Sequence, residues 1–255
     1  MTTSDSRFIT GCLMLLALLF ARMAPAGEPV ALHTSDGVSV YGTLTRARAG
    51  NDTIILLFHQ ARGNHHEYDP VIPVLTKLGY DTLATDQRSG GNLFGGSNQT
   101  VEANGKSTNY LAALPDLEAA LDWAGARHYR TIVTVGSSYS SSLVILLAAR
   151  RQSQITALAA FSPGEYFDDQ NLVKNAAAKI TIPFFITTDP DEAGNVTEIL
   201  SMAHGDNIVH YKQAAGMHGA STLVASRDPQ GYEQNLQHFT AFLHRVADHD
   251  DAPRR

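Results

Sequence analysis

A serine hydroxyl is the best candidate nucleophile in this chain. Ser138 is the centre of the turn Gly-Ser-Ser-Tyr-Ser at residues 136–140. A sharply bent, strained backbone needs small side chains two positions before and after its centre, and here those positions hold Gly136 and Ser140. Centring the bend on Ser137 would place Val135 in the tight position. The pattern predicts a nucleophile elbow, whose serine attacks acyl groups. The competing interpretation is a Ser-rich turn that only caps a helix.

Such a serine needs a general base and an acid that orients the base. Downstream, His218 lies in the segment Gly216-Met217-His218-Gly219, whose glycines let a loop fold an imidazole back over a sheet. An acidic cluster, Asp189-Pro190-Asp191-Glu192, follows a predicted strand. We favour Asp191 as the acid because it lies beyond the strand end on a turn begun by Asp189-Pro190. Asp189 and Glu192 remain alternatives.

An oxyanion that develops during acyl transfer needs hydrogen-bond donors. One donor is expected to be the backbone N–H of Tyr139, directly after the nucleophile. The second is expected from the loop His59-Gln60-Ala61-Arg62-Gly63, where Gln60 or Ala61 would present it. We interpret His59 as structural, holding this loop by a hydrogen bond. The pair His65-His66 has no further ligand at metal-site spacing, so no metal and no cofactor are expected.

These residues must be positioned by the surrounding elements. A hairpin is predicted from Val30–His33 and Val38–Leu44, followed by a continuous apolar strand at Thr53–Phe58. Beyond it, strands and helices alternate, which favours a mainly parallel sheet with helices on both faces. The other predicted strands are 81–85, 131–135, 155–161, 182–187 and 207–213, and the predicted helices are 69–78, 110–127 (kinked or restarted at Pro115), 139–151, 171–179, 196–204 and 229–246.

The N-terminal segment differs from the rest of the chain. Arg7 precedes the apolar run Phe8–Phe20, and Ala24-Pro25-Ala26 follows as a cleavage signal, which predicts a signal peptide over residues 1–26. The protein is then expected to be exported, periplasmic or secreted, and the membrane is expected as a partner only through an uncleaved segment. One domain is predicted over residues 27–247, with a polar tail at 248–255. The net charge of −6, without a basic run, argues against nucleic acid as a partner.

From Thr53 to the last helix, the chain resembles the α/β-hydrolase superfamily, and it looks like a group of mostly bacterial serine hydrolases. The motifs that carry this resemblance are Leu57–Ala61, Asp86–Gly91, Gly136–Ser140 and Phe161–Phe167. The resemblance implies an α/β-hydrolase fold, a Ser138–Asp191–His218 triad and an oxyanion hole from Gln60 and Tyr139. It further implies a small-molecule acyl substrate, with an ester or thioester favoured.

The room for a lid is small. About twenty residues separate the strand ending at Phe161 from the one starting at Ile182, enough for one helix and loops. We therefore expect a minimal lid and an open site for small or short-chain substrates, lined by Glu165 and Tyr166. Two alternatives are a peptidase or amidase on the same triad and a catalytically silent exported binding protein that keeps the fold.

Overall fold

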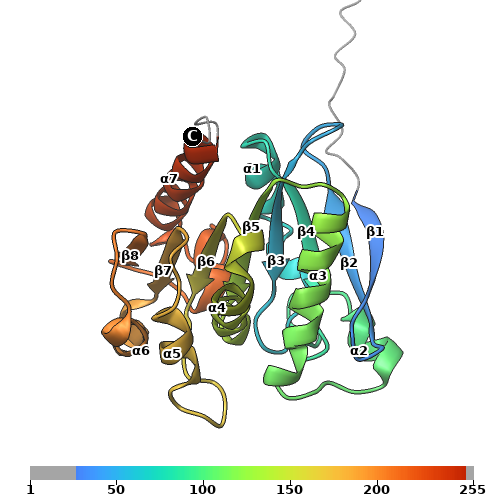
Figure 1. Cartoon of the computed structure of the whole chain (residues 1–255), viewed down its shortest axis with the longest axis horizontal. Helices are drawn as coiled ribbons and strands as arrows, with labels where there is room; N and C mark the ends of the chain where they lie inside the picture. Colours follow the sequence, from blue (N-terminus) through green and yellow to red (C-terminus); the bar gives the residue numbers. More distant parts are fainter. Residues whose placement is uncertain (1–26, 251–255) are drawn as a thin grey trace, which may run out of the picture.

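The computed structural model of this chain describes residues 27–250 (Figure 1). The predicted signal peptide, residues 1–26, lies outside the described residues, as do residues 251–255 of the predicted tail. Residues 248–250 of the predicted tail belong to the last helix, which ends at Asp250.

One mixed sheet forms the centre of the molecule. Its eight strands lie in the order β1-β2-β4-β3-β5-β6-β7-β8. The hairpin of β1 and β2 is antiparallel and joins antiparallel to β4, and every other pairing is parallel. The strands are β1 Glu28–His33, β2 Ser39–Thr45, β3 Thr53–Phe58, β4 Asp81–Asp86, β5 Thr131–Ser137, β6 Ala157–Phe161, β7 Phe184–Thr188 and β8 Ile208–Lys212. The predicted mainly parallel sheet with an N-terminal antiparallel hairpin is confirmed.

The register of the parallel strands brings their carboxyl ends to one edge. Phe58 at the end of β3 pairs with Gly136 in β5, and Ser137 pairs with Phe161 at the end of β6. Phe161 in turn pairs with Thr187 near the end of β7. Residues that follow these strands therefore meet along one side of the sheet, where catalytic groups of open α/β sheets gather.

Helices cover both faces of the sheet. They are α1 Ile72–Lys77, α2 Gln99–Asn104, α3 Leu114–Ala126, α4 Tyr139–Arg151, α5 Leu172–Ala177, α6 Ala193–Ile199 and α7 Tyr232–Asp250, with short 3-10 segments η1 His65–Tyr68, η2 Leu111–Ala113, η3 Gln152–Gln154, η4 Pro190–Glu192, η5 Leu200–Met202 and η6 Gly219–Leu223. None of the helices in residues 27–250 is both long and apolar enough to span a bilayer.

Two apolar cores result, one on each face. The larger contains side chains from α3, α4, α5 and α6, and Figure 1 shows α3 and α4 in front of the strands. The second contains side chains from α1, η6 and α7, including Phe239 and Phe242. The strands supply both cores by alternation: Ile54, Leu56 and Phe58 of β3 belong to the first, and Ile55 and Leu57 to the second. This explains why β3 reads as a continuous apolar run.

Some element boundaries differ from the predicted ones. The helix expected to start at Asp69-Pro70 starts at Ile72, with Val71 as its N-cap and Pro73 in its first turn. The Tyr110–Arg127 segment is restarted as expected, with Pro115 in the first turn of α3. Helix α2 was not predicted; the Asn98 side chain caps it by accepting the N–H of Val101. Between β6 and β7, α5 is the helix that residues 162–183 contain, so the predicted minimal lid is confirmed.

Candidate active site

The bend between β5 and α4 is centred on Ser138, as predicted. Ser138 has φ 58° and ψ −126°, a conformation that non-glycine residues rarely adopt and that costs about 1–3 kcal/mol. The approach of the helix explains Gly136, since a Cβ there would lie 2.3 Å from the carbonyl oxygen of Ser140. Ser138 itself is 6 % exposed and directly follows β5, at the carboxyl edge of the sheet.

Ser140 stands where the elbow motif usually has its second glycine, and its hydroxyl stabilises the bend. The hydroxyl accepts the backbone N–H of Ser137 at 2.9 Å and lies 2.7 Å from the carbonyl oxygen of Phe58, to which it donates. It therefore ties the end of β5 to the end of β3. A hydroxymethyl group is small enough for the bend and supplies contacts that glycine lacks.

His218 is held at the same edge by the two residues that follow it. The N–H of Gly219 donates to Ser162 Oγ at 2.9 Å, directly after β6. The N–H of Ala220 donates to Ser137 Oγ at 2.8 Å, directly before Ser138. Gly219 has φ +70°, and a Cβ there would lie 2.4 Å from Ser137 Oγ. The loop thus packs His218 against the carboxyl ends of β5 and β6, where Ser138 lies.

Glu192 is the carboxylate that contacts His218. Both of its oxygens lie 2.9 Å from Nδ1 of the imidazole. Thr188 Oγ1 donates a further hydrogen bond to Glu192 Oε2 at 3.1 Å. A carboxylate at Nδ1 favours the tautomer with the proton on Nδ1, which leaves Nε2 as an acceptor.

Asp191, the predicted acid, makes no hydrogen bond or ion pair with His218 among residues 27–250. Asp191 is exposed, and its backbone N–H donates to Asp189 Oδ1 at 3.1 Å. The three residues of η4 point in different directions because a 3-10 turn advances about 120° per residue. Glu192 rather than Asp191 consequently faces the histidine, and it was one of the alternatives that the sequence left open.

A second carboxyl lies beside this pair. Burial, followed by the nearby charge of Glu192, raises the pKa of Asp189. Single ligand atoms of Asp189, Glu192 and His218 lie within 4.8 Å of one another, so in residues 27–250 this is the group whose composition and spacing could hold a metal ion. The Glu192–His218 hydrogen bond already engages two of the three side chains.

Gln60 does not fit its predicted role as an oxyanion donor. Its backbone N–H donates to Glu67 Oε2 at 2.7 Å and is no longer free. The next residue, Ala61, has an N–H for which no acceptor is found among residues 27–250, and the same holds for Tyr139 at the start of α4. The backbone N–H groups of Ala61 and Tyr139 are therefore free to donate, whereas that of Gln60 is not.

The interpretation of His59 as structural is confirmed. Its Nδ1 bonds to the carbonyl oxygen of Gln60 at 2.8 Å, and its Nε2 accepts the N–H of Gln87 at 3.0 Å. Burial lowers the pKa of His59 to about 4, so the ring is neutral at pH 7. The adjacent histidine pair is also engaged locally, since His65 Nδ1 lies 2.9 Å from Asp86 and His66 Nδ1 lies 2.7 Å from Asp69.

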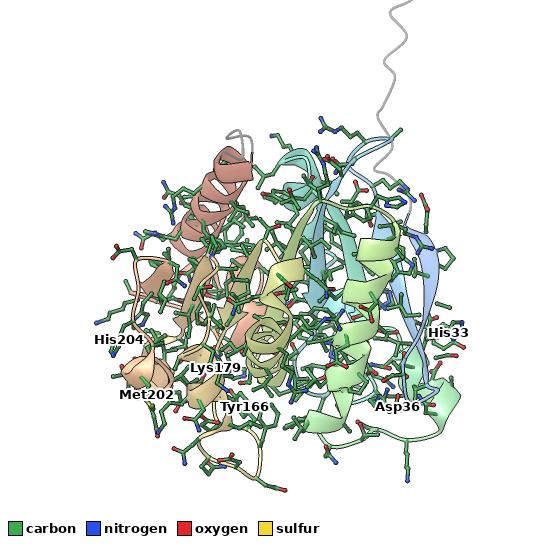
Figure 2. All side chains as sticks on the ribbon, viewed as in Figure 1. His33, Asp36, Tyr166, Lys179, Met202 and His204 are labelled. Carbon is green, nitrogen blue, oxygen red and sulfur yellow. The ribbon has the colours of Figure 1, made fainter. Side chains whose placement is uncertain are left out.

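Of the two predicted substrate-binding residues, Tyr166 lies at the site and Glu165 does not. The carboxylate of Glu165 accepts the N–H groups of Val173 and Lys174 and so caps α5. Tyr166 lies in the lower part of the view in Figure 2. Burial raises the pKa of Tyr166 to about 12. A hydrogen bond with Ser138 lowers this pKa, and the negative charges of Glu192 and Asp189 raise it. Tyr166 therefore neighbours Ser138 and lies within the electrostatic range of the acidic cluster.

A cavity of about 840 Å³ opens beside Tyr166. Its apolar wall comes from η2 and from the segment before α5. Arg62 also lines it, from the loop of residues 59–63, which is called the oxyanion loop below for the role predicted for it. The lining residues include Arg62, Tyr110, Leu111, Tyr166, Phe167 and Leu172. Tyr110 stacks on Tyr139 with a centroid separation of 4.5 Å, which joins this wall to the start of α4. One wall of the cavity therefore packs on the residue that follows Ser138.

Comparison with known proteins supports the fold. No family model and no curated protein sequence matches the chain. Among solved structures, it is similar to the Pyrococcus furiosus esterase Pf2001, with a TM-score of 0.68 and 21% identity, covering 86% of this chain and 92% of that one. It is also similar to Est1E of Butyrivibrio proteoclasticus with bound ferulic acid, with a TM-score of 0.64, 17% identity and coverage of 86% and 99%. A dienelactone hydrolase of Anabaena variabilis gives a TM-score of 0.64, 16% identity and coverage of 88% and 99%. The chain therefore has the α/β-hydrolase fold.

Proposed function

We propose that this protein is a serine hydrolase that cleaves a small ester or thioester through an acyl-enzyme on Ser138. The observation that carries the proposal is the placement of His218. A carboxylate holds its Nδ1, and the two N–H groups after it are bonded to hydroxyls beside Ser138 and directly after β6. Of the three similar structures, one is named an esterase and another a dienelactone hydrolase, which fits this chemistry.

In the proposed mechanism, His218 Nε2 removes the proton of Ser138 as the hydroxyl attacks the substrate carbonyl. Glu192 keeps the other proton on Nδ1 and stabilises the imidazolium that forms. The N–H groups of Ala61 and Tyr139 bind the oxyanion. His218 then protonates the leaving group, and water, activated by the same imidazole, hydrolyses the acyl-enzyme.

The substrate is proposed to be small and to enter without a large lid. Residues 162–183 hold a single short helix, so the cavity beside Tyr166 remains open to solvent. A short acyl group would bind near Ser138, and the wider part of the cavity would accept the rest of the ester. Hydrolysis rates across p-nitrophenyl esters of increasing acyl length test this, and we expect the highest kcat/KM for acetate or butyrate.

Covalent labelling tests the proposal as a whole. A fluorophosphonate should modify the wild-type protein at Ser138, and the variant Ser138→Ala should not be modified. Absence of labelling in folded wild-type protein would instead favour a silent binding protein. Hydrolysis of anilides at rates similar to those of esters would favour the peptidase or amidase alternative.

The proposed site of action is outside the cytoplasm, with residues 1–26 removed after Ala26. The support is the sequence pattern alone: Arg7, an apolar run, and Ala-Pro-Ala before Gly27. The N-terminal residue of the protein purified from its own cells tests this proposal. An N-terminus at Gly27 is expected, and an intact Met1 would overturn it.

A further inference from the structure

Glu67 is a buried carboxyl that the mechanism above does not use. It lies in η1 and is 1 % exposed. Each of its oxygens accepts one short hydrogen bond: Oε2 from the backbone N–H of Gln60 at 2.7 Å, and Oε1 from Ser137 Oγ at 2.7 Å. No cation forms a salt bridge with it among residues 27–250. Arg227 instead donates to the backbone carbonyl of Glu67 at 2.8 Å. A buried carboxyl without an ion pair is costly, so this one needs an explanation.

Three segments of the candidate site converge on this carboxyl. Gln60 belongs to the oxyanion loop, and Ser137 immediately precedes the nucleophile. The same Ser137 hydroxyl accepts the N–H of Ala220, two residues after His218. Gly219 fits closely against both partners of Glu67, because a Cβ on it would lie 2.4 Å from Ser137 Oγ and 2.9 Å from Gln60 Oε1.

We propose that Glu67 is a positioning residue for the reaction at Ser138. By holding the N–H of Gln60, its carboxylate orients the oxyanion loop so that the N–H of Ala61 is left for the substrate oxygen. Through the Ser137 hydroxyl, which accepts the N–H of Ala220, it also fixes the backbone that follows His218. The inference rests on the proposed function, since it concerns the alignment of the same groups.

The ionised form of Glu67 fits the contacts, because both of its partners are donors. Burial raises the pKa of Glu67 to about 7, while the bonds from Ser137 and Gln60 and the charge of Arg227 oppose this. The other titratable groups that face it are Tyr68 and Tyr139. Burial raises the pKa of each well above the ordinary value of a tyrosine, so both are neutral. Near pH 7, protonation of Glu67 would turn one of its two carboxylate oxygens from an acceptor into a donor. The hydrogen bond of that oxygen with Ser137 or Gln60 would then be disturbed. We therefore expect Glu67 to contribute an ionisation to the pH dependence of the reaction.

The variant Glu67→Gln tests this, because it keeps the shape and replaces one acceptor by an NH₂ donor. We expect kcat for p-nitrophenyl acetate to fall about 10- to 100-fold, as for a small misplacement of reacting groups, with KM changing less than about threefold. The rate of fluorophosphonate labelling should fall by the same factor. On the acid side, log(kcat/KM) of the wild type should show two ionisations, and that of Glu67→Gln only one.

A second variant and a matched control complete the test. Ser137→Ala removes the link between Glu67 and Ala220, so it should lower kcat similarly. The double variant should be no slower than the slower single one, because coupled positions are not additive. If Glu67→Gln does not fold, Ser137→Ala alone is used for the test. Its kcat should fall while its KM stays nearly unchanged. The control Asp81→Asn alters a fully buried carboxyl at the opposite, amino end of β4, where it accepts the N–H of Ala47. It should keep the wild-type kcat per folded molecule.

Two negative results have different meanings. If the wild type is labelled and Glu67→Gln matches it in kcat and pH profile, the positioning role is wrong and the proposed function stands. If the wild type is neither labelled nor active on any ester, the proposed function itself is wrong.

Discussion

Replacing Glu192 by glutamine changes the partner of His218 and keeps its size. The carboxylate oxygens lie 2.9 Å from Nδ1, and the amide would present either an oxygen or an NH₂ group at that distance. An NH₂ group favours the tautomer with its proton on Nε2, which cannot accept the proton of Ser138. The glutamine also no longer stabilises the imidazolium. A comparable loss in a buried triad lowers kcat about 10⁴-fold.

The expected loss here is smaller, because this pair is partly solvated. The side chains of His218 and Glu192 are 38% and 31% exposed, and solvent screens the charge of such pairs. We therefore expect Glu192→Gln to lower kcat about 10²- to 10³-fold, which corresponds to about 3–4 kcal/mol in the activation barrier. KM should change little, because Glu192 acts through His218.

The assay is steady-state hydrolysis of p-nitrophenyl acetate, with folding checked by thermal denaturation. Asp191→Asn is the matched control, since Asp191 is exposed in the same turn. It should keep kcat within about twofold, as surface substitutions usually do. A near-normal Glu192→Gln together with a large loss in Asp191→Asn would refute the geometric reasoning and restore Asp191 as the acid.

Three further predictions concern the framework of the site. The folded-state pKa of Glu67, about 7, lies above its ordinary value of 4.5, so its contribution to stability is complete below pH 4.5 and is lost as the pH rises through 7. Urea unfolding measures the difference in the free energy of unfolding between the wild type and Glu67→Gln. This difference should fall by about 3 kcal/mol between pH 4.5 and pH 8. A difference that does not change with pH would contradict the burial argument. Gly136→Ala should cost about 1–3 kcal/mol and abolish labelling at the elbow, because its Cβ would meet the Ser140 backbone; a fully labelled variant would contradict this. Ser140→Ala should cost about 1–3 kcal/mol, because it leaves the buried N–H of Ser137 without its acceptor; an unchanged midpoint of thermal denaturation would contradict this.

The sequence predicted the elbow and the main strands because local chemistry determines them. Thr53–Phe58 is apolar on both faces and forms β3 with the predicted bounds. Gly136 and Ser140 identify Ser138 as the strained centre because a larger side chain at position 136 would meet the Ser140 backbone. His218 could be found from its flanking Gly216 and Gly219. In each case the signal lies within a few residues of the position concerned.

The acid and the oxyanion donor depended on contacts between distant segments. Asp191 and Glu192 are adjacent, and only the direction of the 3-10 turn decides which one faces His218. Gln60 was unsuitable because Glu67, seven residues later, takes its N–H. Glu67 itself follows His65 and His66 in a polar segment, and no neighbouring residue in the sequence indicates that it is buried. The helix was predicted to start at Asp69-Pro70 because this pair has the sequence of a helix N-terminus. In the structure η1 comes first, and α1 starts only at Ile72.

Isolation of the acyl-enzyme tests the central claim most directly. The wild type is mixed with p-nitrophenyl acetate, quenched in acid during the first turnover, digested and analysed by mass spectrometry. The account predicts an acetyl group on the Ser138 hydroxyl, and none there in Ser138→Ala. Rapid release of p-nitrophenol with no acetyl group on Ser138, or with the acetyl group on another residue, would contradict it.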